Sequence, residues 1–250
     1  GRITTNGYMP TSVSGGYVVP GHPGDTSMYP RDTSVMLLSL LELGQHSLAR
    51  SVLNFMLSAL GSPAFNLSHV PHILVANSAQ TRIIDVDRTE QVDAAMQVFV
   101  AFGRYAAVTN DTSLSDKYFP LMASFLNRIV APAATLQTSD CLGTKEPIEC
   151  KPAGKIRWVN ASSGLVWTPC LEHVRLAHFW SGYDLFTNAF AAEALRVMAD
   201  VAVQQGQVLQ AQGWRAVRGM VLHGISTTLT TSVPASEGKG EVEIYSELVG

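Results

Sequence analysis

The stretch YPRDTSVMLLSLLELGQHSLAR runs from Tyr29 to Arg50. It contains one helical pattern and the beginning of a second, and a helix-stop signal separates them. Apolar residues recur at every third or fourth position across residues 33–43 and again across 47–60, which is the spacing of one face of an α-helix. Gly44 stands between the two patterns, and glycine favours the left-handed conformation that ends a helix. The stretch therefore predicts a helical hairpin with a very short turn.

Two more pairs of helical patterns follow along the chain. Residues 89–107 and 113–130 are joined by VTND, and residues 183–204 and 208–229 are joined by QGQ. Asn and Asp favour turns and helix caps, and glycine again favours a helix stop. The chain therefore predicts three helical hairpins.

The connections between the pairs, residues 61–88 and 131–182, are long and contain runs typical of β-strands: HILVA, TRIIDV and KIRWVNASSGLVW, the last with a hairpin turn at NASSG. Short turns at one end of each pair and long connections at the other predict that the long connections share one face. The expected fold class is all-α. It is an α/α toroid of six-hairpin type, of which this chain supplies about three helix pairs, with small β-hairpins in the long loops.

The composition predicts a single domain over residues 1–250 with a large core, because 46% of the residues are hydrophobic and only 15% are charged. The net charge is −3 without any run of Lys or Arg, which argues against nucleic acid as a partner. No apolar stretch reaches about 18 residues without a polar interruption, so no membrane insertion is expected. The final EIYSELVG resembles the beginning of another element, so we expect the domain to be incomplete at its C-terminus.

Three sequons, at Asn66, Asn110 and Asn160, fall in predicted loops or turns. A single sequon arises easily by chance, but three favour a glycosylated protein of the secretory pathway with N-glycans. Cys141 and Cys150 bracket the short loop CLGTKEPIEC, whose spacing permits a local disulfide bond. Cys170 remains unpaired in this scheme, either as a buried thiol or as the partner of a cysteine elsewhere. The sequence therefore predicts a secreted or extracellular glycoprotein.

Charged and aromatic residues gather where long connections enter the first helix of each pair. Arg31 and Asp32 precede the first helix, and DVDRTEQVD, which ends at Asp93, precedes the third. WTPCLEHVRLAHFWSGYDLFTN, residues 167–188, precedes the fifth and adds aromatic rings. Carboxylates bind hydroxyl groups and transfer protons, and aromatic faces cover the C–H surface of a sugar ring. These groups predict a carbohydrate site at the helix starts.

Each of these residues also has a simpler interpretation. Asp32 suits a plain N-cap for a helix that begins at Thr33. The acids and the arginine within DVDRTEQVD suit a solvated loop in which they pair with one another. Asp93 lies in an apolar helix and must either be paired or line a cavity. The tryptophans suit the core equally well.

The segments YPRDTSVMLLSLLELGQHSLAR, EQVDAAMQVFVAFGRYAAVTND and YDLFTNAFAAEALRVMADVAVQQG resemble the six-hairpin glycosidases, the glucoamylase-like superfamily. Those enzymes share an aromatic-x-Arg-Asp start of an early inner helix and a Gln-x-Asp start of a later one. The resemblance covers roughly residues 28–205, and the order and spacing of the motifs carry it.

The resemblance implies roles for individual residues. Arg31 and Asp32 would bind hydroxyl groups of the innermost sugar, and Glu172 would be the general acid, with Asp184 as the second choice. The family's catalytic base comes from a late hairpin, for which this sequence offers no convincing match. The full set of implied substrate-binding residues is Tyr29, Arg31, Asp32, Gln91, Asp93, Trp167, Trp180 and Tyr183.

The expected function is that of a secreted glycoside hydrolase that inverts the anomeric centre and acts at the end of an α-linked oligo- or polysaccharide. The first alternative is a non-catalytic structural or carbohydrate-binding relative of the same fold. The second alternative is a polysaccharide lyase, which would use Tyr183, His178 and Arg175. No cofactor is expected, because the histidines do not have the spacing of a metal site.

Overall fold

The computed structural model describes residues 7, 27–77, 79, 81–130, 159–160, 162–167, 183–234, 241–245 and 248–249. The predictions for Cys141, Cys150, Cys170, Glu172 and Trp180, and those for Arg175 and His178, lie outside the described residues.

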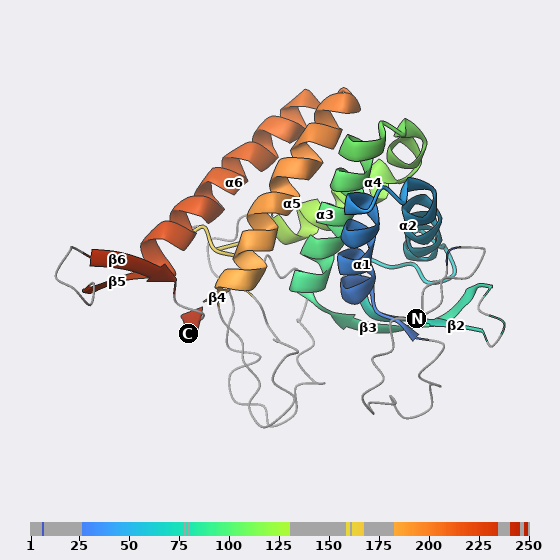
Figure 1. The fold of residues 1–250 in the computed structure, drawn as a ribbon, viewed down its shortest axis with the longest axis horizontal. Helices are drawn as coiled ribbons and strands as arrows, with labels where there is room; N and C mark the ends of the chain where they lie inside the picture. Colours follow the sequence, from blue (N-terminus) through green and yellow to red (C-terminus); the bar gives the residue numbers. More distant parts are fainter. Residues whose placement is uncertain are drawn as a thin grey trace.

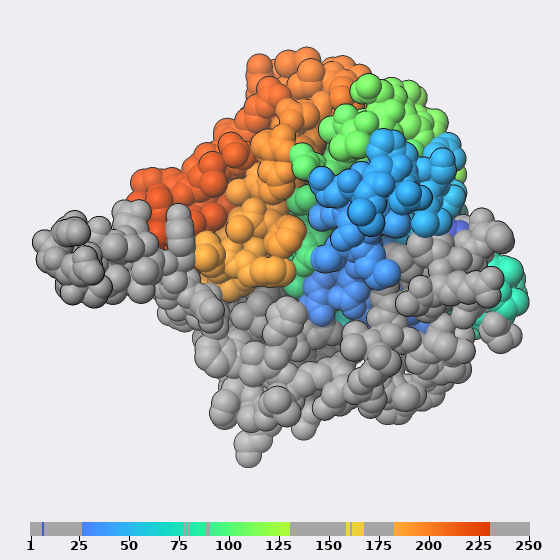
Figure 2. Space-filling model, viewed as in Figure 1, coloured from blue at the N-terminus to red at the C-terminus, as the bar shows by residue number. Residues whose placement is uncertain are grey.

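Six helices form three antiparallel hairpins, as the sequence predicts (Figure 1). The hairpins are α1 (Pro30–Glu42) with α2 (His46–Leu60), α3 (Val92–Thr109) with α4 (Thr112–Val130), and α5 (Leu185–Gln204) with α6 (Val208–Thr228). Helix α3 packs against both α1 and α5, and all three begin at the same end of the molecule. A strip of α3 is visible between α1 and α5 in Figure 2. This arrangement is the expected part of an α/α toroid.

The short turns have the predicted chemistry. Gly44 adopts φ +69° and Gly206 adopts φ +71°, and in each turn the next residue donates its N–H to a carbonyl five residues back. This pattern of hydrogen bonds satisfies carbonyl groups at the end of a helix. Asn110 ends α3 in the left-handed conformation, and the side chain of Asp111 accepts the N–H of Ser113 at the start of α4.

The long connections place short strands beneath the helix starts. Strands β1 (Ser27–Met28), β2 (Pro71–Ala76) and β3 (Ile83–Glu90) form an antiparallel sheet in that order. Val159 and Val166 form an antiparallel bridge across the predicted NASSG turn. Further along the chain, β4 (Tyr183–Asp184) pairs with β7 (Leu248–Val249), and β5 (Thr230–Pro234) pairs with β6 (Glu241–Tyr245). The expected β-hairpins in the long loops are therefore present.

Two helix starts lie three residues away from the predicted ones. Helix α3 begins at Val92 and not at residue 89, because the preceding residues continue β3 and pair with β2. Helix α1 begins at Pro30 and not at residue 33, since proline already has a helical φ and lacks the N–H that a first helical residue leaves unpaired. The capping residue of α1 is thus Tyr29, so the interpretation of Asp32 as an N-cap is wrong.

Helix α3 is the centre of the core, because fourteen of its eighteen residues are buried. It approaches α5 tightly at Gly103, where an added Cβ would stand 2.5 Å from Cβ and Cγ2 of Val197. The missing side chain at Gly103 therefore sets the spacing of the two helices.

At the end with the short turns, Asp111 joins three helices. Its carboxylate lies 2.8 Å from Nε of Arg50 on α2 and accepts a 2.6 Å hydrogen bond from the hydroxyl of Tyr105 on α3. Hydrogen bonds from Ser113, Tyr105 and Arg50 hold the pKa of Asp111 well below its usual range. Burial and the bond to Asp111 raise the pKa of Tyr105 to about 12.

None of the helices within the described ranges combines the length and the apolar character needed to cross a membrane.

Replacing Gly103 by Ala tests the α3–α5 contact. The added methyl group would collide with Val197, so we expect a loss of about 1–3 kcal/mol in the free energy of unfolding, measured by denaturant titration. Gly213→Ala on α6 is the control: it meets no atom within 4 Å and should gain up to about 1 kcal/mol from helix propensity. Equal gains for both variants would contradict the tight contact.

Replacing Asp111 by Asn tests the cluster at the short turns. Because the pKa of Asp111 is lower in the folded protein than in the unfolded chain, its stabilisation is complete above pH of about 4 and is lost as the pH falls further. The variant should melt below the wild type at pH 7, and the difference in Tm should shrink below pH of about 4. Asp116→Asn removes an exposed carboxylate from α4, the helix that follows Asp111, and is the control. A pH-independent difference for Asp111→Asn would refute the explanation.

Candidate functional site

The starts of α1, α3 and α5 bring together predicted site residues from distant parts of the sequence (Figure 1). Tyr29 and Arg31 lie at the start of α1, Asp93 at the start of α3, and Tyr183 and Asp184 immediately before α5. The N-terminal turns of helices carry unpaired N–H groups and a partial positive charge, which favour anionic and hydroxyl ligands. This end of the helical layer is therefore the candidate site.

An ion pair connects the first two helix starts directly. Nη1 of Arg31 lies 3.3 Å from Oδ2 of Asp93, and their side chains are 15% and 5% exposed. Nε of Arg31 lies 3.6 Å from Oδ1 of Asp32, whose side chain is 36% exposed. An unpaired carboxylate at the depth of Asp93 would be costly, and the guanidinium compensates it. Of the two interpretations of Asp93, pairing is thus observed.

Two glutamines flank Asp93 in the sequence, one before α3 and one within it. Gln91 is the capping residue of α3 and is 5% exposed. Gln97 lies one turn beyond Asp93 on nearly the same helix face and is 1% exposed. Neither polar atom of its amide has a partner among the described residues. Gln97 is not among the residues predicted from the sequence, although its spacing of four residues from Asp93 was a usable signal.

The start of α5 is built around polar side chains. Oδ1 of Asp184 accepts the N–H of Thr187 at 2.6 Å, and Asp184 is 4% exposed. Asn188 exchanges hydrogen bonds with both the N–H and the carbonyl of Val166. Asp184 therefore caps the helix, and Asn188 fastens the 159–167 hairpin to it.

Two predicted aromatic residues contact each other beside this start. The rings of Trp167 and Tyr183 meet edge to face with their centroids 5.0 Å apart. The amide of Asn160 donates a 2.8 Å hydrogen bond to the hydroxyl of Tyr183, and its Oδ1 accepts N–H groups of the turn. Both rings are partly buried and pack against the core, and their sugar-binding role stays a prediction.

Two charged residues of β3 contact partners outside the segment DVDRTEQVD. Asp87 contacts His72 on β2 at 3.1 Å, and Arg88 donates to the carbonyl of Phe65. Asp85 is exposed and accepts the N–H of its neighbour Val86. The ring of His72 also meets that of Tyr29. His72 is not among the residues predicted from the sequence, because the histidines there were weighed only as metal ligands.

The three predicted glycosylation sites differ in exposure. Asn66 and Asn110 are exposed, whereas Asn160 is half-buried and its amide holds the turn. No group of three or more metal-ligating side chains occurs within the part of the chain that the structure describes. None of this tests the predicted N-glycans.

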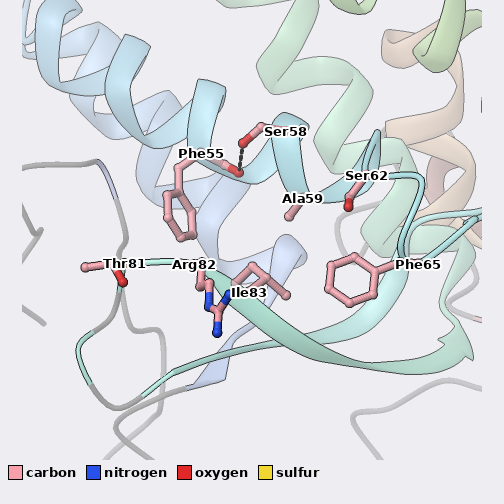
Figure 3. A pocket seen from close by; sticks show the side chains of 8 residues that line it. All are labelled: Phe55, Ser58, Ala59, Ser62, Phe65, Thr81, Arg82 and Ile83. Atoms are coloured by element: carbon pink, nitrogen blue, oxygen red, sulfur yellow. Dashed lines mark hydrogen bonds between the residues drawn. The ribbon is translucent and has the colours of Figure 1, made fainter.

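A separate pocket of about 270 Å³ lies between α2 and the beginning of β3 (Figure 3). Phe55, Phe65 and Ile83 supply apolar surface, and Arg82 and Thr81 supply polar groups. None of the predicted substrate-binding residues lines it. The pocket is therefore distinct from the helix starts.

Neither a family model nor a curated protein matches the sequence. A solved structure of a bacterial glucoamylase in complex with acarbose aligns with 90% of this chain and 25% of its own, with a TM-score of 0.54 and 15% identity. A metal-independent α-mannosidase of Streptococcus pneumoniae, in a non-productive complex with α-1,6-mannobiose, aligns with 90% of this chain and 55% of its own, with a TM-score of 0.56 and 15% identity. This chain thus spans less than two thirds of either protein. The architecture of the chain is that of the six-hairpin glycosidases, as its motifs predicted.

Proposed function

We propose that this chain belongs to a secreted glycoside hydrolase that acts on α-linked sugars, removing residues from the chain end with inversion at the anomeric carbon. The observation that carries the proposal is the ion pair of Arg31 and Asp93, 3.3 Å apart, at the common end of three helix starts. The fold shared with a glucoamylase and an α-mannosidase supports the substrate class.

The polar groups at the helix starts suit the binding of a sugar. Arg31 carries several N–H donors in a fixed fork, and its contacts with Asp32 and Asp93 set the direction of that fork. Asp32 is partly exposed, so its carboxylate can accept hydroxyl hydrogen bonds. Binding one sugar ring in a fixed orientation lowers the entropic cost of the reaction.

The chemical step requires two carboxyl groups. One donates a proton to the leaving oxygen, and the other removes a proton from the water that attacks the opposite face of the ring. In inverting enzymes they stand roughly 6.5–9.5 Å apart. Glu172 is our proposed general acid. Asp184 remains the second choice, although capping α5 already accounts for its burial. We assign no base, because Glu241 and Glu243 lie in the β5–β6 hairpin, away from the helix starts in Figure 1.

The proposed secretion has two supports in the sequence and the structure. The asparagines of two sequons, Asn66 and Asn110, are exposed, as the attachment of a glycan requires. The spacing of Cys141 and Cys150 permits the proposed local disulfide bond.

Replacing Glu172 by Gln in the full-length protein tests the general acid. The amide cannot donate the proton, so hydrolysis of α-linked gluco- and manno-oligosaccharides should fall at least about a hundredfold, with Tm nearly unchanged. Glu42→Gln, at a side chain that is 75% exposed, is the control. Hydrolysis retained by Glu172→Gln would remove this residue from the mechanism. Sugar binding without product in the wild type would instead indicate the non-catalytic relative, and an unsaturated product would indicate the lyase.

Replacing Arg31 by Lys tests the sugar site. Lysine keeps the charge but loses the fork, so kcat/KM should fall about tenfold to a hundredfold. Arg50→Lys is the matched control, because Arg50 also pairs with an aspartate on a neighbouring helical hairpin but lies at the opposite end of the layer. Unchanged kcat/KM in Arg31→Lys would refute the location of the site.

A further inference from the structure

His72 occupies a position that normally excludes polar side chains. It lies on β2, the central strand of the three-stranded sheet, and is 7% exposed. Every neighbour that follows it on this strand, from Ile73 to Ala76, is a buried apolar residue. A buried imidazole is costly unless its nitrogens are paired, so the partners of His72 indicate what it does.

The first of these partners is Asp87 on β3. Nδ1 of His72 lies 3.1 Å from Oδ2 of Asp87. The pairing of the strands is irregular here, since Pro71 faces Glu90 and Ile73 faces Asp87, so two steps along β2 match three steps along β3. Such bulges redirect side chains. A carboxylate beside one ring nitrogen fixes both the orientation of the imidazole and the nitrogen that carries its proton.

The second partner is the ring of Tyr29. The two ring centroids lie 5.3 Å apart with an angle of 66° between the planes, which is an edge-to-face contact. Strand β1 makes this contact possible, because Met28 pairs with Leu74 and brings the next residue, Tyr29, alongside β2. Tyr29 is also the residue before α1, two positions from Arg31. The ring of His72 therefore contacts a residue of the candidate site.

We infer that His72, oriented by Asp87, positions the ring of Tyr29 as a sugar-binding surface at the start of α1. The inference rests on the proposed function and extends it: His72 and Asp87 are positioning residues that act without touching the sugar. The ring of Tyr29 is only half-buried, and the ring of His72 is one of the groups that hold it in place. The bulge in β3 sets the place of Asp87, and through it the geometry of the site.

A double-mutant cycle on binding tests the inference in the full-length protein, with acarbose and α-1,6-mannobiose as probes in calorimetry. His72→Ala should weaken binding about threefold to tenfold, the range expected for an aromatic contact. In a Tyr29→Ala background the same change should have no effect, because the ring through which it acts is gone. His72→Gln, which keeps a polar group for Asp87 but no ring, should weaken binding as His72→Ala does. An undiminished effect of His72→Ala in the Tyr29→Ala background would overturn the inference.

A measurement without ligand separates this inference from the proposed function. In protein labelled with 3-fluorotyrosine, the ¹⁹F resonance of Tyr29, assigned with Tyr29→Phe, should shift in His72→Gln and Asp87→Asn. It should stay in place in Asp85→Asn, whose carboxylate is exposed and accepts a backbone N–H of its own strand. An unmoved resonance in the first two variants would overturn the inference. A shifted resonance in a protein that neither binds nor cleaves the sugars would instead overturn the proposed function.

Discussion

The burial of α3 is the constraint on which the rest of the structure depends. This helix lies between α1 and α5 and has buried residues on almost every side. Its neighbours must therefore approach closely, and the charge of its buried carboxylate must be compensated inside the protein. Gly103 meets the first requirement, because the absence of a side chain lets Val197 of α5 come into contact. Arg31 meets the second, since its guanidinium compensates the buried carboxylate of Asp93.

The same constraint connects the fold to the candidate site. An apolar helix that is buried along its length leaves its N-terminal turn as the natural place for charge, because the N–H groups there are unpaired and the helix dipole favours anions. Asp93 occupies this turn, and its partner Arg31 occupies the corresponding turn of α1. At α5, Asp184 fills the cap itself and Asn188 fastens the neighbouring hairpin. Three helix starts thus carry polar groups for three different local reasons, and their alignment makes a shared polar surface.

Short β-strands lie next to this surface, because they directly precede the helix starts in the chain. The sheet of β1, β2 and β3 leads the chain into α1 and α3, and so its register decides which side chains stand beside the helix starts. Two contacts connect the strands of this sheet: Asp87 on β3 contacts His72 on β2, and His72 contacts Tyr29, the residue that follows β1. At the opposite end, Asp111 connects the α3–α4 turn to Arg50 of α2. The two ends of the layer therefore differ: one is held together by this cluster, and the other carries the candidate site.

The sequence by itself determined the three hairpins, their short turns and the common face of the long connections. These features follow from local causes, namely helical periodicity, glycine or asparagine in the left-handed conformation, and the difference in loop lengths. The tertiary structure decided the remainder. Strand pairing moved the start of α3 to Val92, and Arg31 found its partner 62 residues away at Asp93. His72 acquired a role only when a bulge brought Asp87 beside it. Such contacts depend on the register between distant segments, which no local pattern of residues encodes.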